Sequence, residues 1–296
     1  MKNKKEALGG LIIIVLLILV LVTYLTFYNY RKENKKEIPL NDNSTATIYI
    51  YNDNSILKVE DLSKVTDTKN VVGEYNCKYD DCDILETNLI NPIYDNKYII
   101  LKENSEVFIY NFTTEKIVSD KYSNLINRKN NHLLVEKNNK YGLIDIEGEK
   151  LIDTIYDEID LDMYNNITKV KLNNLYGVYD VKEMKEIIKP KYENINISDS
   201  KYYSVKKDDG WYVIDNNDTL ITNGYTYTFA FNKGFIAQIE NNLHILKYTN
   251  EEELLYEEVI PVEDNFEVSR NSSIITININ EKKYEYDINR NSLINK

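Results

Sequence analysis

Histidine, glycine and proline are scarce in this 296-residue chain, which contains 2 His, 9 Gly and 4 Pro. A Ser–His or Cys–His mechanism would have to use His132 or His244, and no nucleophile motif lies near either residue. The sequence also lacks a glycine-rich phosphate loop, an H-E-x-x-H zinc motif and a G-x-S-x-G elbow. We therefore predict a protein that is not an enzyme and has no catalytic residues and no cofactor. An enzyme with an unrecognised site is an alternative.

Cysteine is limited to Cys77 and Cys82, in the segment "CKYDDC". The two residues do not form a zinc site by themselves, because structural zinc takes four ligands and both histidines lie far away in the sequence. They are a candidate disulfide if this region lies outside the cytoplasm, and otherwise a pair of reduced thiols. The run from Asp160 to Asn165 lacks the Gly and the closing Glu of a calcium loop. We predict no metal site.

The chain has fewer basic than acidic residues, 36 against 48, which gives a formal net charge of −12. Nucleic-acid binding needs basic groups that neutralise phosphates. The composition therefore predicts that nucleic acid is not a partner.

Long hydrophobic runs are absent except for one, "ALGGLIIIVLLILVLVTYLTFY", at residues 7–28. An uncharged stretch of this length predicts a transmembrane helix whose partner is the lipid bilayer, and the run is too long for the core of a cleaved signal peptide. A short basic tail (1–6) precedes it and a polar stalk (29–45) follows. Lys2, Lys4 and Lys5 precede the run and four basic residues follow it, so the charges alone do not fix the orientation. We predict a single-pass cell-membrane protein with its C-terminal domain outside the cytoplasm; a cytoplasmic-facing, membrane-tethered scaffold is the alternative.

The remainder, 46–296, is rich in tyrosine (26 in the chain), isoleucine and valine, which favour strands. Apolar and polar residues alternate, and turn residues such as Asn138-Asn139 and Glu147-Gly148 recur every six to ten positions. This pattern predicts an all-β fold.

The β region is built from a repeat of about 35 residues. Tyr141, Tyr176 and Trp211 are spaced by 35 residues, and Tyr156, Tyr192 and Tyr225 trail them by 15, 16 and 14. Weaker copies place Ile56, Val107, His244 and Tyr284 in the slot of the first aromatic residue, which makes seven units. The signature positions, to which we assign a structural role, are Tyr141, Gly142, Asp145, Gly148, Tyr156, Tyr176, Gly177, Asp180, Tyr192, Trp211 and Asp215.

These copies resemble the WG-repeat family of bacterial proteins, whose signature is a Trp-Gly or Tyr-Gly pair, an Ile-Asp, a Gly turn and a later Lys-Tyr-Asp-x-Ile. Tyr141-Gly142 and Tyr176-Gly177 match the first pair, whereas Tyr212 follows Trp211 where Gly is expected, and the preceding Gly210 can take over its role. The resemblance implies tandem β-hairpin units, envelope association in some members and no established catalysis. It names no ligand.

A unit of this size cannot bury both faces of its strands, so the recurrent rings are expected to form buried joints between neighbouring units. An exposed aromatic ladder for sugar or peptide is the alternative. We predict a propeller-like array, with an open β-solenoid as the alternative. Its function is predicted as a non-catalytic interaction module that binds an unknown protein, peptide or envelope polymer.

Overall fold

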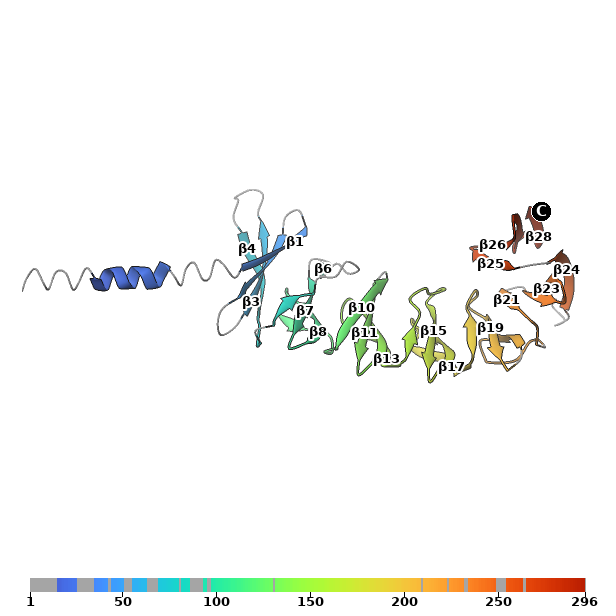
Figure 1. Ribbon diagram of the computed structural model, residues 1–296, viewed down its shortest axis with the longest axis horizontal. Helices are drawn as coiled ribbons and strands as arrows, with labels where there is room; N and C mark the ends of the chain where they lie inside the picture. The colour runs from blue at the N-terminus through green and yellow to red at the C-terminus, as the bar shows by residue number, and fades with distance from the viewer. Residues whose placement is uncertain are drawn as a thin grey trace, which may run out of the picture. The chain divides into compact units, whose positions relative to one another are not determined.

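The computed structural model describes residues 15–25, 35–41, 44–50, 55–62, 69–79, 81–85, 93–94, 97–129, 131–208, 210–222, 224–231, 234–248, 254–262 and 265–295. Within these ranges all regular structure after residue 25 is β-strand, which confirms the all-β prediction (Figure 1). The strands form seven antiparallel sheets, and the chain divides into two compact units. The first unit comprises Met1–Asn131 and Asp145–Glu149; the second comprises His132–Ile144 and Lys150–Lys296.

The first two sheets belong to the first unit. One sheet has the order β1-β2-β3-β4, formed by Lys35–Asn41, Ser44–Ile50, Ser55–Leu62 and Lys69–Asn76. The other has the order β5-β7-β8-β9, formed by Asp83–Ile84, Tyr98–Glu103, Glu106–Asn111 and Lys116–Ile117, and β6 (Ile93–Tyr94) also pairs with β7. The polar stalk predicted over 29–45 thus contains β1, which pairs along β2.

The next three sheets carry the strong copies of the repeat. The third sheet contains β10 (Asn124–Lys129), β11 (His132–Lys137), β12 (Lys140–Asp145) and β13 (Lys150–Tyr156). The fourth contains β14 (Glu158–Ile159), β15 (Ile167–Leu172), β16 (Leu175–Asp180) and β17 (Lys185–Tyr192). The fifth contains only β18 (Asn194–Asn196), β19 (Tyr202–Lys207) and β20 (Gly210–Asp215).

Two four-stranded sheets complete the described strands. The sixth sheet contains β21 (Thr228–Phe231), β22 (Gly234–Ile239), β23 (Asn242–Tyr248) and β24 (Leu254–Pro261). The seventh contains β25 (Phe266–Asn271), β26 (Ile274–Ile279), β27 (Lys282–Asp287) and β28 (Ser292–Asn295). Closure of the array into a propeller, as against an open solenoid, stays a prediction.

Successive sheets of the second unit bury their faces against each other. One apolar cluster contains Leu143, Ile152 and Tyr156 of the third sheet. It also contains Val170, on β15 of the fourth sheet, and Val181, in the turn that follows β16. The opposite face of the fourth sheet packs on the fifth through a second cluster: Ile167, Val178, Ile188, Tyr192, Ile195, Tyr203, Val205 and Ile214. The same alternation continues between the sixth and seventh sheets. Each unit of the repeat therefore obtains its core from its neighbours, as expected for stacked repeats.

The predicted membrane anchor is wrong. Within this run the structure describes residues 15–25, which are helical. Among the described residues, no helix combines the length and the apolarity that crossing a membrane requires. The single-pass cell-membrane localisation predicted from residues 7–28 is corrected accordingly; 7–14 and 26–28 lie outside the described residues.

Candidate binding site around Trp211

The two aromatic marks of the repeat are cross-strand partners. Tyr141 pairs with Tyr156 and Tyr176 pairs with Tyr192, in each case between the third and fourth strands of one sheet. Trp211 pairs in the same way with Tyr225 through an isolated bridge. The spacing of 14 to 16 residues in the sequence is therefore the length of one strand, its turn and the return strand.

The pairs in the fourth and fifth sheets extend into transverse rows that cross their sheets. In the fourth sheet, Glu158 lies opposite Lys171, and Lys171 lies opposite Tyr176. The ammonium of Lys171 is 3.7 Å from a Glu158 carboxylate oxygen and 5.1 Å from the centre of the Tyr176 ring. Two other sheets have rows of the same kind: Asp83, Lys102, Val107 and Tyr122 in the second sheet, and Asn194, Lys206, Trp211 and Tyr225 in the fifth.

The glycine of each Tyr-Gly pair lies where the fourth strand bulges. The register shifts between Tyr176 and Val178, and a Cβ on Gly177 would come within 2.5 Å of the Ile188 carbonyl oxygen. Gly142 is confined in the same way by Ile152 and Thr154. A side chain at this slot would push the two strands apart.

The signature aspartates cap the turn that follows the third strand. Asp145 accepts hydrogen bonds from the amides of Glu147 and Glu149, at 2.9 and 2.8 Å. Asp180 accepts from Lys182 and Glu183, and Asp215 from Asn217 and Thr219. Gly148 has a φ of 89°, which agrees with its placement in a turn. These residues serve turn formation.

The trailing tyrosines connect one sheet to the next. The Tyr156 hydroxyl donates a 2.8 Å hydrogen bond to Glu186 Oε1, and the Tyr192 hydroxyl donates one of 2.7 Å to Asp218 Oδ1. Both phenol rings are buried. Burial raises the pKa of each hydroxyl, and the adjacent carboxylate raises it further.

This arrangement predicts a loss of stability at alkaline pH. The pKa of a tyrosine hydroxyl in the unfolded chain is 10.0. Burial raises the pKa of Tyr110 to about 12, and it also raises the pKa values of Tyr156 and Tyr192. Because the folded state binds these protons more tightly, their contribution is complete below pH 10 and decreases as the pH rises through the folded pKa values. Urea midpoints measured from neutral pH to pH 12 should fall steeply above pH 10, and less steeply in Tyr192→Phe. A midpoint independent of pH over this range would contradict the assignment.

The fifth sheet departs from the repeat at the Trp211 row. It has no regular fourth strand among the described residues; instead two bridges, Trp211 with Tyr225 and Ile214 with Leu220, connect the returning segment. Tyr212 occupies the slot of Gly142 and Gly177. Its ring is accommodated by Gly224, where a Cβ would lie 2.9 Å from Tyr212 Cζ. The close approach to Tyr212 is thus made by Gly224, and the replacement of the missing glycine by Gly210 stays a prediction; a Cβ on Gly210 would lie 3.3 Å from the Gly224 Cα.

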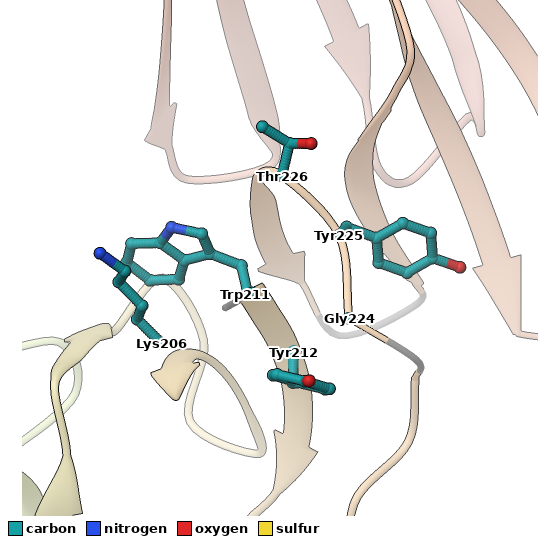
Figure 2. A pocket seen from close by; sticks show the side chains of 7 residues that line it. Lys206, Trp211, Tyr212, Gly224, Tyr225 and Thr226 are labelled. Atoms are coloured by element: carbon teal, nitrogen blue, oxygen red, sulfur yellow. The ribbon is translucent and has the colours of Figure 1, made fainter. Parts of the chain in front are cut away.

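A cavity of about 630 Å³ opens beside this row. Gly210 and Gly224 leave it open because they have no side chains, and Lys206 lies beside the indole of Trp211 (Figure 2). The remaining lining residues are Tyr212, Tyr225 and Thr226. The Lys206 ammonium is 3.8 Å from a Glu193 carboxylate oxygen, which partly balances its charge.

Trp211 also lines a second cavity, of about 400 Å³. Its walls carry carboxylates from Asp160 and Asp162, side-chain amides from Asn194 and Asn196, the Lys169 ammonium and the Tyr227 ring. A single partly buried indole thus borders two cavities that are rich in hydrogen-bonding groups. This combination can stack on a flat ligand face and bond to polar groups at its edges.

Burial of the rings divides the signature into two classes. Tyr156 and Tyr192 are buried, whereas Tyr141, Tyr176 and Trp211 are partly buried. The buried joint expected for both marks therefore describes Tyr156 and Tyr192, whereas Tyr225 and the first aromatic residues are partly exposed.

In two of the weaker copies, the structure places the slot of the first aromatic residue one position earlier than the sequence predicts. In the sixth sheet the hairpin pairs Ile239 with Asn242, so the slot of the first aromatic, the second residue after the turn, belongs to Leu243 and not to His244. In the seventh sheet the hairpin pairs Ile279 with Lys282, so the second residue after the turn is Lys283 and not Tyr284. A shift of one residue moves a side chain to the other face of its sheet.

The structure joins Cys77 and Cys82 in a disulfide whose Cα atoms are 5.9 Å apart. His132 lies on β11 and His244 on β23, so the topology places the two histidines on different sheets.

The sequence analysis did not predict the Trp211 row as a binding site. The signal was present as the one Trp of the chain, followed by Tyr where the repeat requires Gly.

Comparison with known proteins supports the repeat. Residues 141–176 and 176–211 each match the family model described as WG containing repeat, which confirms the predicted resemblance for this stretch. No curated protein matches the chain.

Among solved structures, the chain is similar to Kluyveromyces lactis Hsv2, with a TM-score of 0.30, 10% identity and coverage of 77% of this chain and 85% of that one. It is also similar to PorZ of Porphyromonas gingivalis, described as a surface component of the type-IX secretion system. The TM-score is 0.30 and the identity 9%, with coverage of 85% of this chain and 36% of that one. Likenesses at these TM-scores carry no argument about function.

Proposed function

We propose that this chain, whose residues 141–211 match WG containing repeats, is a non-catalytic binding module with its ligand site at Trp211. The observation that carries the proposal is that the repeat departs from its pattern at Trp211, which lines two cavities. Trp replaces Tyr, Tyr replaces Gly and the fourth strand is irregular, all at one row. Departures from a locally consistent pattern are expected at functional sites.

The chemistry of the lining favours a polysaccharide as the ligand. The C–H groups on a sugar face carry partial positive charge and suit the negative face of an indole. The hydroxyl groups at the sugar edge both donate and accept, which matches the Asp160 and Asp162 carboxylates, the Asn194 and Asn196 amides and the Lys169 ammonium. Cavities of about 400 and 630 Å³ fall in the range of small-ligand sites.

Intrinsic fluorescence tests the proposal directly, because Trp211 is the one tryptophan of the chain. Oligosaccharides of glucose and of N-acetylglucosamine should change the emission of the folded protein in a saturable way. Trp211→Ala should weaken binding, measured by calorimetry, by about 10-fold or more, as for a central aromatic contact.

Lys206→Ala and Lys171→Ala form a matched pair, because the two lysines hold the same position in rows of neighbouring sheets. Only Lys206→Ala should weaken binding. If the Trp211 emission responds to unstructured peptides but not to saccharides, the Trp211 site stands and the polysaccharide is rejected as its ligand. Cleavage of the saccharide would reject the non-catalytic role, and unchanged emission with every probe would reject the Trp211 site.

A further inference from the structure

A fully buried carboxylate lies at the end of β7. Glu103 has 0% exposure, and its oxygens accept hydrogen bonds from the Tyr75 hydroxyl, at 2.8 Å, and from the Lys78 backbone amide. Both donors, a phenol hydroxyl and a backbone amide, are uncharged groups. Glutamate is almost never fully buried without a cation, because desolvation of the charge is costly. Among the described residues, these two hydrogen bonds bring no positive charge to the Glu103 carboxylate.

The disulfide lies directly beside this carboxylate. Cys77 and Cys82 are 3% and 5% exposed, and one ligand atom from each cysteine and from Glu103 lie within 4.8 Å of one another. In the disulfide the sulfurs carry no charge and add nothing that balances Glu103. As thiolates they would be strong ligands for a metal cation.

We propose that reduction of the Cys77–Cys82 disulfide converts this cluster into a zinc site whose ligands are the two cysteine sulfurs and the Glu103 carboxylate. The reductant is a dithiol, which transfers two electrons and two protons to the disulfide and becomes a disulfide itself. On metal binding, each cysteine thiol releases its proton to solvent and forms a sulfur–zinc bond. The fourth position of the tetrahedral ion is left for water.

Charge and ligand type both fit zinc. Three anionic ligands and one divalent cation leave a single net negative charge, which equals the charge that Glu103 brings to the oxidised cluster. Metal binding therefore adds no net charge to the buried site. Two thiolates with one carboxylate suit zinc and exclude calcium and magnesium, which take oxygen ligands.

The loop that carries the cysteines is held by contacts other than the disulfide. The Asp81 carboxylate accepts hydrogen bonds from the backbone amides of Asn104, at 2.7 Å, and Ser105, at 2.9 Å. These amides belong to the β7–β8 turn that directly follows Glu103. The loop therefore stays beside Glu103 when the sulfur–sulfur bond is broken, so the three ligands remain together after reduction.

The test titrates the full chain with Co²⁺ and then Zn²⁺, before and after reduction by a phosphine. The phosphine takes up oxygen from water, releases two thiols and is removed before the metal is added. The reduced chain should bind one Co²⁺ with the absorption of a thiolate–cobalt complex, and Zn²⁺ should displace it. Zn²⁺ should also raise the melting temperature of the reduced chain and not that of the oxidised chain.

Glu103→Gln should weaken zinc binding by the reduced chain by about 10-fold or more. Glu106→Gln is the matched control, since Glu106 pairs with Glu103 across the hairpin but is not in the cluster, and it should bind zinc as the wild type does. Equal binding by the oxidised chain, absence of thiolate–cobalt absorption, or unchanged affinity of Glu103→Gln would each overturn the proposal. The two wild-type measurements decide the matter even where the variant does not fold.

Discussion

Replacement of Tyr156 by Ala is expected to lower the free energy of unfolding by about 3–5 kcal/mol, the range for loss of a buried aromatic side chain. The ring is 2% exposed and lies in the apolar cluster shared by the third and fourth sheets. Its edge packs on Tyr179 with ring centres 6.4 Å apart, and its hydroxyl bonds to Glu186. The variant therefore removes two contacts between the third and fourth sheets.

Two further variants separate these contributions. Tyr156→Phe keeps the ring and removes the hydrogen bond to Glu186, which is exposed, so water can replace the hydroxyl and the cost should be about 0.5–1.5 kcal/mol. Ile155→Ala is the control, since Ile155 is the neighbouring residue on β13, is 49% exposed and should change stability by less than about 0.5 kcal/mol. Urea unfolding followed by circular dichroism measures all three. Equal losses in Tyr156→Ala and Ile155→Ala would show that Tyr156 is not a joint between sheets.

Gly177→Ala is expected to destabilise the fold by about 1–3 kcal/mol or more, as an overpacked site does. The added Cβ would lie 2.5 Å from the Ile188 carbonyl oxygen and 2.7 Å from the Pro190 nitrogen, both atoms of the backbone. Relief requires the bulged β17 to move away from β16, which would also disturb the pairing of Tyr176 with Tyr192.

Gly210→Ala provides the comparison for Gly177→Ala. Its nearest contact would be 3.3 Å from the Gly224 Cα, so a small shift of the segment around Gly224 accommodates the methyl group. Its loss in urea midpoint should be clearly smaller than that of Gly177→Ala. If the two variants lose the same amount, the glycine of the Tyr-Gly pair is not required for strand approach, and its recurrence needs another explanation.

Local chemistry was enough to predict the repeat, because its marks are short-range. The left-handed pairs Asn138-Asn139 and Asn173-Asn174 have positive φ at both positions, as a tight hairpin requires, and the aspartate caps act within four residues. The period itself appears because each sheet repeats the same sequence of strand and turn lengths. The hydrophobic run at 7–28 predicted a membrane span, and among the described residues no helix has the length and apolarity for one.

Contacts between distant segments lie beyond such reasoning. Sequence spacing shows that Tyr156 follows Tyr141, but only the register makes them partners across two strands, and only sheet stacking brings Glu186 to the Tyr156 hydroxyl. The placement of Gly224 under Tyr212 and of Glu103 beside Cys77 and Cys82 has the same origin. A turn or a cap depends on a few neighbouring residues, whereas a cavity or a ligand set depends on how separately formed sheets pack, and for this chain that packing produced both proposed sites.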